Sequence, residues 1–235
     1  MKVSDFDYAL PESLIAQHPL EPRDASRLLV LNADGHIEHR HFRDLPEYLR
    51  PGDILVANDT RVIPARLFAR KPTGGRIEIL LLERADDDTW KALIGGRNVA
   101  IDLPLTLLDR DGNETSVAAT VITVGADALR ELRFSAPVEE WIESLGYAPL
   151  PPYIHEPLDD PERYQTIYAQ PPGSAAAPTA GLHFTADLLL ALREQGVLFE
   201  TVTLHVGLDT FKPVTVQEVT DHVIHTEWAR LSTDA

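Results

Sequence analysis

Short apolar runs that end in turn-forming residues organise the first part of the chain. The run over Leu28–Leu31 stops at Asn32-Ala33-Asp34-Gly35, which is typical of a strand followed by a turn. A second run over Gly52–Ala57 predicts a buried strand that ends in the polar residues Asn58-Asp59-Thr60-Arg61. Open α/β sheets place ligands at the carboxyl ends of such strands, so these polar residues form the first candidate site.

The apolar runs become shorter and closer together between Pro72 and Ser135. Runs of this kind, separated by Asp-rich and Gly-containing turns, are typical of a small barrel or sandwich. The expected strands are Arg76–Glu83, Thr89–Ile94, Leu103–Leu108, Ser116–Val124 and Leu129–Phe134.

Helical spacing returns after this β-rich stretch. Apolar residues at i, i+3, i+4 and i+7 from Val138 to Leu145 predict a helix that ends at Gly146. Thr185 can cap a second helix that closes at Gly196, and a strand over Val197–Val206 follows. The predicted fold is therefore an α/β body with a mixed sheet, interrupted by a small closed β-barrel. The expected bounds are residues 1–70 and 136–235 for the body and 71–135 for the inserted barrel.

The composition limits the class of protein. Hydrophobic residues make up 44% and charged residues 25%, as in an ordinary globular protein, and there is no cysteine. The absence of cysteine excludes a disulfide scaffold and thiolate chemistry and fits the cytoplasmic location that we expect. The sequence holds no apolar run near the ~20 residues that cross a bilayer, and its start has no apolar signal region, so no membrane partner is expected.

The net charge of −16 argues at first against a nucleic-acid partner, because an acidic surface repels phosphate. The segment Arg61–Arg76 is an exception, since it contains five cations and no acid. Two interpretations stay open for it. One is a solvated loop and edge strand, and the other is a site for phosphate or another anion.

Two loops carry candidate histidines. The small residues of Gly173–Gly181 predict a flexible loop that opens onto a helix start, where free N–H groups and the helix dipole favour an anion and His183 could transfer protons. An ordinary connection with a capping Thr185 explains the same pattern. His205 lies at the end of a strand and before Gly207, which suits a ligand contact or a hydrogen bond to the backbone equally well.

Two further groups of polar residues have alternative interpretations. Asp59 could form a structural ion pair with Arg61 or Arg66, or it could position a substrate. The pattern His222-x-x-His225-x-Glu227 allows a metal site, and with it a metal-dependent hydrolase, although nothing in the sequence fixes a helix there.

Seven segments together resemble the S-adenosylmethionine:tRNA ribosyltransferase-isomerase family of queuosine biosynthesis. They extend from Phe6 to Gly207, and the similarity reaches Glu227. The segments are Phe6–Gln17, Arg23–Leu29, Asn58–Leu67, Pro149–Ile154, Arg163–Tyr168, Ala177–Thr185 and Val202–Gly207. The third and the sixth are long and specific.

The resemblance implies a reaction that no spacing of residues could indicate. Such enzymes transfer the ribosyl part of S-adenosylmethionine to 7-aminomethyl-7-deazaguanine at the tRNA wobble position and rearrange it, giving epoxyqueuosine. S-adenosylmethionine is a co-substrate, and no other cofactor or metal is expected. The partners implied are tRNA and S-adenosylmethionine, and the full-length form is expected to be a monomer.

The matching positions give the candidate site residues. His183, His205 and Asp59 are expected to be catalytic, and Arg70, Lys71 and Arg76 are expected to contact tRNA. The expected substrate-binding residues are Arg61, Arg66, Tyr153, Tyr168, Thr179, Gly181, Thr185, Gly207 and Thr210.

The sequence also departs from the family pattern. Asp209 stands where the family usually has glycine. Two family motifs, one with paired threonines, an arginine and a Leu-Glu pair and one reading Asn-Phe-His-Leu-Pro, do not occur in these 235 residues. We therefore expect the chain alone to be less stable than a full-length relative, to self-associate and to have little transferase activity. The alternative function is a truncated, non-catalytic relative that binds tRNA or a partner.

Overall fold

The computed structural model describes residues 1–125, 128–207, 214–224 and 226–232. The chain divides into two compact units, which are described one at a time below. The first contains Met1–Arg61, Pro151–Pro171 and Ala177–Ala235, and the second contains Val62–Leu150 and Pro172–Ala176.

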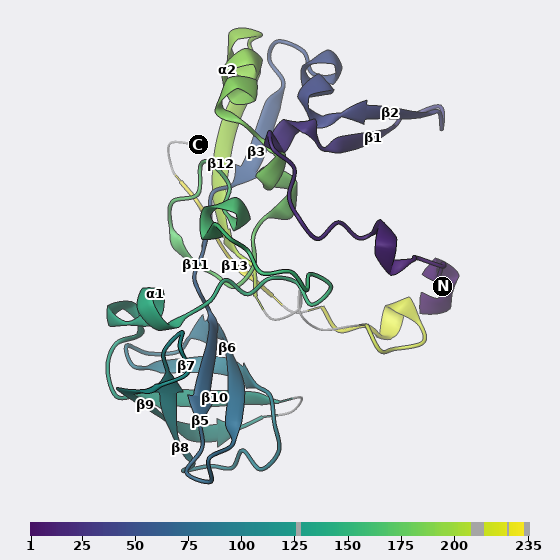
Figure 1. The fold of residues 1–235 in the computed structure, drawn as a ribbon. Helices are drawn as coiled ribbons and strands as arrows, with labels where there is room; N and C mark the ends of the chain where they lie inside the picture. The colour runs from purple at the N-terminus through teal and green to yellow at the C-terminus, as the bar shows by residue number, and fades with distance from the viewer. Residues whose placement is uncertain (126–127, 208–213, 225, 233–235) are drawn as a thin grey trace. The chain divides into compact units, whose positions relative to one another are not determined.

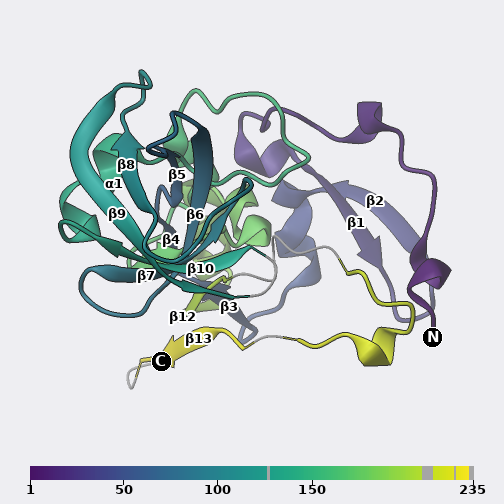
Figure 2. The same cartoon turned by 90° about the horizontal axis from the view of Figure 1, so that it is seen from below.

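The second unit is built around a closed antiparallel barrel with the strand order β10-β7-β6-β5-β8-β9 (Figure 2). All five strands predicted for this region are confirmed to within two residues. The barrel strands are β5 (Arg66–Arg70), β6 (Arg76–Arg84), β7 (Thr89–Ile94), β8 (Pro104–Leu108), β9 (Glu114–Val124) and β10 (Leu129–Phe134).

The sixth barrel strand, β5, was not predicted. Its side chains alternate, so that Leu67 and Ala69 are buried inside while Arg66, Phe68 and Arg70 face outward. The second unit accordingly begins at Val62, upstream of the predicted boundary after residue 70. Burial of leucines such as Leu67 is worth roughly 1.5–3 kcal/mol each, which holds the barrel closed.

A short helical segment follows the barrel. The predicted helix is divided into a 3-10 turn, η5 (Val138–Glu140), and one turn of α-helix, α1 (Ile142–Leu145). Its four apolar positions are all buried, as the spacing predicted. The ring of Trp141 packs 5.1 Å from that of Phe134, so the segment belongs to the barrel unit and the unit extends past residue 135.

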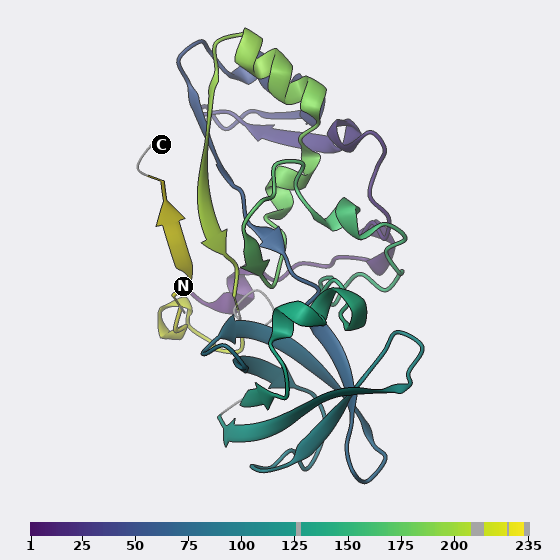
Figure 3. The same cartoon turned by 90° about the vertical axis from the view of Figure 1, so that its left-hand side faces the viewer.

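The first unit contains the predicted mixed sheet, with strand order β13-β12-β3 (Figure 1). β3 (Ile54–Asn58) and β12 (Leu198–His205) are parallel, and β13 (Trp228–Leu231) is antiparallel to β12. The helix α2 (Ala186–Glu194) packs on β12 (Figure 3). In the described residues α1 and α2 are the only α-helices, so the mixed sheet and barrel are well supported while the α/β class is supported only weakly.

The remaining elements are short. β1 (Arg27–Leu31) and β2 (Ile37–His41) form a hairpin, and β4 (Arg61–Val62) pairs with β11 (Pro172–Ser174) where the chain passes between the units. The other 3-10 helices are η1 (Val3–Phe6), η2 (Glu12–Leu14), η3 (Arg23–Ala25), η4 (Phe42–Tyr48), η6 (Pro161–Tyr164), η7 (Thr179–His183) and η9 (Val219–Asp221).

One expectation about burial is wrong. The β3 strand was expected to be buried, but Ile54 is 56% and Val56 is 64% exposed. In the Gly173–Gly181 segment, Ser174 is fully buried and Ala175 and Ala176 are 1% and 2% exposed. The small side chains of these three residues therefore serve close packing.

Candidate functional site

The polar turn after β3 is fixed by the side chain of Asn58. Its Nδ2 donates to the carbonyl of Leu204 at 2.8 Å, and its Oδ1 accepts from the backbone N–H groups of Leu204 and Thr60 at 3.0 and 3.1 Å. The amide thus joins the carboxyl ends of the parallel strands β3 and β12. This brings the Asn58–Arg61 turn and the end of β12 together, so two candidate segments that were predicted separately lie side by side.

His205, the last residue of β12, lies between a hydroxyl and an indole. Its Nδ1 is 2.7 Å from Oγ1 of the fully buried Thr60. The antiparallel register places Trp228 directly opposite, and the two rings stack with centroids 4.8 Å apart and an interplanar angle of 16°. Burial lowers the pKa of His205, and the charge of Asp59 opposes that shift. The ring is therefore held in one orientation beside a carboxylate.

Asp59 does not form the ion pair that was one alternative from the sequence. Its Oδ1 accepts a hydrogen bond from the hydroxyl of Thr203 at 2.8 Å. Arg61 pairs with Glu162, and Arg66 pairs with Glu78 at 3.1 Å. Asp59 is thus available to act on His205, whose pKa its charge raises.

His183 ends the 3-10 helix η7 and forms a second cluster. Its Nδ1 lies 3.0 Å from Oγ of Ser26, and its ring packs 5.2 Å from Phe42. Burial lowers the pKa of His183, while a hydrogen bond to the backbone of Arg23 raises it. Within the described part of the chain, no hydrogen bond or ring contact joins His183 to His205.

Three residues of the His183 cluster were missed as site residues. Arg23 donates to three backbone carbonyls, those of Glu162, Gln165 and Leu182, at 2.9, 2.8 and 3.2 Å. Asp24 contacts Thr185, and Ser26 contacts His183. The Arg23-Asp24-x-Ser26 segment belongs to a family motif, and its polar side chains could have indicated a contact with the site.

The start of α2 is occupied by groups of the protein itself. The hydroxyl of Thr185 accepts from the N–H of Leu188 at 3.2 Å, which confirms the predicted cap. The same hydroxyl donates to Oδ2 of Asp24 at 3.3 Å. A carboxylate therefore already lies beside this helix start, where the helix dipole favours negative charge.

Gly181 permits a close approach, although the group that approaches is a protein side chain. A Cβ at position 181 would lie 2.3 Å from the hydroxyl oxygen of Tyr168 and 2.9 Å from a methyl carbon of Thr166. Burial raises the pKa of Tyr168 to about 12, so the phenol stays protonated and able to donate. Oγ1 of Thr166 is buried and, in the described structure, has no hydrogen-bond partner. The hydroxyl of Tyr168 and the methyl group of Thr166 therefore lie beside η7.

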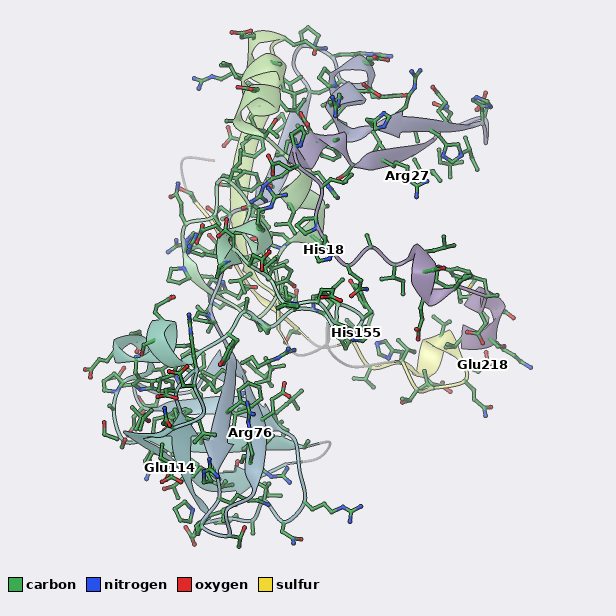
Figure 4. The ribbon with its side chains drawn as sticks, in the orientation of Figure 1. His18, Arg27, Arg76, Glu114, His155 and Glu218 are labelled. Atoms are coloured by element: carbon green, nitrogen blue, oxygen red, sulfur yellow. The ribbon has the colours of Figure 1, made fainter. Side chains whose placement is uncertain are left out.

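The basic stretch is less free than its composition suggested. Arg70 pairs with Glu114 at 3.1 Å, and Lys71 donates to the carbonyl of Arg97. With Arg61 and Arg66 also paired, three of the five cations have carboxylate partners. The exception is Arg76, whose guanidinium carbon lies 4.0 Å above the centre of the Phe68 ring on the outer face of the barrel (Figure 4).

The other candidates are placed as follows. Tyr153 is 52% exposed, and its carbonyl accepts from Gln17, whose Oε1 in turn accepts from the N–H of His155. This pair joins the N-terminal segment that carries His18 to the loop of His155 (Figure 4). The N–H of Gly207 donates to Glu227 at 3.0 Å, and Thr179 begins η7. Thr210 and Asp209 lie outside the described residues.

The metal alternative is not tested, because His225 lies outside the described residues. Among the residues that the structure describes, His, Cys, Asp and Glu side chains do not gather in groups of three or more that could hold a metal ion. No helix in the described ranges has the length and apolar character needed to cross a membrane.

Comparison with known proteins identifies the family. The chain matches the family described as "Queuosine biosynthesis protein" over residues 3–235. It is 52% identical to the S-adenosylmethionine:tRNA ribosyltransferase-isomerase of Symbiobacterium thermophilum over 237 residues, covering 100% of this chain and 69% of the relative. It is 51% identical to the protein of that name from Moorella thermoacetica, covering 97% of this chain and 67% of the relative.

A solved structure, the S-adenosylmethionine tRNA ribosyltransferase of Thermotoga maritima, is 40% identical with a TM-score of 0.35. It covers 86% of this chain, and this chain spans 59% of its length. The family predicted from the motifs is thus confirmed by the sequence matches. The chain belongs to the queuosine biosynthesis protein family.

Proposed function

We propose that this chain carries donor-binding and proton-transfer residues of an S-adenosylmethionine:tRNA ribosyltransferase-isomerase. The observation that carries the proposal is 51–52% identity, over nearly the whole chain, to curated relatives of that name. The donor is S-adenosylmethionine, and the acceptor is 7-aminomethyl-7-deazaguanine at the tRNA wobble position. The product is epoxyqueuosine, and the proposed location is the cytoplasm, with which a tRNA substrate and a cysteine-free composition are compatible.

The chemistry requires two proton movements. A base removes a proton from the carbon next to the positively charged sulfur of the donor, and an acid returns a proton to adenine as it leaves. Histidine suits both tasks because it titrates near neutral pH. Burial lowers the pKa of both His183 and His205, so each ring is neutral and able to accept a proton at neutral pH.

We assign the base to His183 and a proton-transfer role to His205. His183 is supported by its place at the end of η7, the helix in which Gly181 admits the hydroxyl of Tyr168, a group able to orient a polar donor. His205 is supported by Asp59, whose charge favours the protonated ring that an acid needs. Trp228 covers one face of His205 and excludes water from that side.

The remaining substrate contacts follow the family motifs. Thr179, Gly181 and Thr185 are proposed around the donor, and Arg61, Arg66, Tyr153, Gly207 and Thr210 elsewhere around the substrates. For tRNA, Arg76 is the best supported of the three proposed barrel residues, because it is exposed and stacked on an aromatic ring and no carboxylate contacts it among the described residues. Arg70 and Lys71 also belong to the proposal, although Arg70 pairs with Glu114 and Lys71 donates to a backbone carbonyl.

Alanine substitution of each histidine tests the proposal. Incubation of tRNA carrying the precursor base with labelled S-adenosylmethionine measures ribosyl transfer and adenine release together. When the full-length site is supplied, we expect His183→Ala and His205→Ala each to lower the rate on the order of 100-fold or more, the usual effect of losing an acid–base group.

His222→Ala is the matched control, because His222 belongs only to the metal alternative. Its turnover should equal that of the parent. Parental turnover in His183→Ala would remove that residue from the mechanism. A loss confined to His222→Ala would favour metal-dependent chemistry, and tRNA binding without turnover in the parent would favour the binding-only relative.

A further inference from the structure

Ser26 links the ring of His183 to the backbone carbonyl of Arg23. The carbonyl fixes the direction of the hydrogen bonds at the Ser26 hydroxyl. Oγ of Ser26 donates to the carbonyl of Arg23 at 2.9 Å. A carbonyl can only accept, and serine has a single hydroxyl proton, so that proton lies between Ser26 and Arg23. The oxygen of Ser26 therefore turns a lone pair toward Nδ1 of His183, which is 3.0 Å away.

The backbone of Arg23 also contacts the ring of His183 itself. A hydrogen bond from the His183 ring to the backbone of Arg23 raises the pKa of the histidine, which is the effect of an acceptor on a ring N–H. Ser26, the neighbour of Nδ1, thus presents a lone pair to the ring. Without a proton on Nδ1, the lone pair of that nitrogen would face the lone pair of Ser26, which is unfavourable in a half-buried place.

We propose that Ser26 is a positioning residue that fixes His183 as the Nδ1–H tautomer and so leaves Nε2 as its proton acceptor. Among the described residues, the side chain within hydrogen-bond distance of the ring is that of Ser26, and its contact is with Nδ1. The inference rests on the proposed function only where it makes Nε2 the base of the transfer reaction. The tautomer itself follows from the contacts of Ser26.

Arg23 makes this arrangement rigid. Its guanidinium donates to the carbonyls of Glu162, Gln165 and Leu182. Leu182 precedes His183, so one residue fixes the histidine through both its backbone and, by way of Ser26, its ring. The ring of Phe42, tilted by 41° with its centroid 5.2 Å from that of the imidazole, limits rotation further. The histidine is thereby pre-oriented before any substrate binds.

Nitrogen NMR of the full chain tests the tautomer directly. Long-range proton–nitrogen spectra distinguish a protonated from an unprotonated ring nitrogen, and a His183→Gln variant assigns the signals. Because burial lowers the pKa of His183, the ring is neutral in mildly alkaline buffer. We expect a protonated Nδ1 and an unprotonated Nε2 in the parent. A dominant Nε2–H form would overturn the inference.

Variants at Ser26 test the cause. In Ser26→Ala we expect the ratio of Nε2–H to Nδ1–H to rise roughly fivefold, the size expected for loss of one ordinary hydrogen bond. Ser26→Thr keeps the hydroxyl and should restore the parental ratio. Ser144→Ala is the matched control, because Ser144 makes the same bond to the carbonyl three residues earlier, at 2.7 Å, away from any histidine. An unchanged ratio in a folded Ser26→Ala would refute the role of Ser26.

The transfer assay separates this inference from the proposed function. If both hold, Ser26→Ala lowers kcat by a factor similar to its change in tautomer ratio and leaves the KM for the donor unchanged. If the spectra show the expected tautomer and His183→Ala retains turnover, the inference stands and the catalytic role of His183 fails. If Ser26→Ala does not fold, the spectrum of the parent alone decides the tautomer.

Discussion

At the scale of single residues, two half-buried histidines make the stability of this protein depend on pH. Burial lowers the pKa of His183 and of His205 below the ordinary value of 6.5. Between the lowered pKa and 6.5, the unfolded chain binds protons that the folded chain does not, so protonation favours unfolding there. Stability is therefore complete above 6.5 and is lost as the pH falls through the folded pKa values.

Thermal unfolding measured from about pH 7.5 to about pH 5.5 checks this expectation. We expect Tm to fall across that range in the parent and to fall less in the double variant His183→Gln, His205→Gln. The control is His36→Gln, since His36 is exposed in the turn between β1 and β2. The same pH dependence in the double variant and in the parent would show that other groups cause it.

At the scale of elements, α1 ends in a contact that only glycine permits. A Cβ at position 146 would lie 2.0 Å from the carbonyl oxygen of Pro64 and 2.7 Å from that of Ile142. Both are backbone atoms, so neither can move without shifting the chain. We expect Gly146→Ala to destabilise the barrel unit by about 1–3 kcal/mol or more, the usual cost of overpacking.

Chemical denaturation of the full chain measures this loss. Gly95→Ala is the matched control, because Gly95 lies in the same unit and the nearest atom to its added Cβ is 4.0 Å away. The control should change stability by less than about 1 kcal/mol, the ordinary effect of exchanging glycine and alanine. Equal midpoints for the two variants would mean that the Pro64 carbonyl adapts at little cost.

The elements also show what a sequence can and cannot predict. The barrel strands β6 to β10 could be predicted because each is a local apolar run between turn residues. The strand β5 was not predicted, because only Leu67 and Ala69 alternate as buried positions and the arginines Arg66 and Arg70 make the segment similar to a charged loop. The predicted cap at Thr185 is confirmed, because capping depends on residues that are neighbours in the chain.

Contacts between distant segments could not be predicted in the same way. Ser26 and His183 are 157 positions apart, and His205 meets Trp228 only through the register of β12 and β13. Neither apolar period nor composition carries this information. The partners of the Arg61–Arg76 cations could not be predicted either, because Glu162, Glu78 and Glu114, which pair with three of them, are not adjacent to them in the sequence.

At the scale of the whole molecule, the net charge of −16 limits how this protein can bind RNA. Most of its surface repels phosphate, so affinity must come from a few local cations. Each cation that contacts phosphate releases counterions and steepens the dependence of affinity on salt. An arginine already paired with a carboxylate contributes less, because its charge is compensated before RNA arrives. Arg70 on the outer barrel face has such a partner in Glu114, whereas no carboxylate among the described residues pairs with Arg76.

Their substitution gives a direct test. We expect Arg76→Ala to weaken tRNA binding and to reduce the slope of log K against log salt by roughly one, while Arg70→Ala changes the slope less because Glu114 compensates its charge. Arg76→Lys retains the charge and should keep the slope, although it loses the planar stack on Phe68. The measurement is a filter-binding titration at several salt concentrations. If Arg76→Ala binds with the parental affinity and slope, tRNA does not contact this face of the barrel, and the cations that overcome the acidic surface must lie elsewhere in the chain.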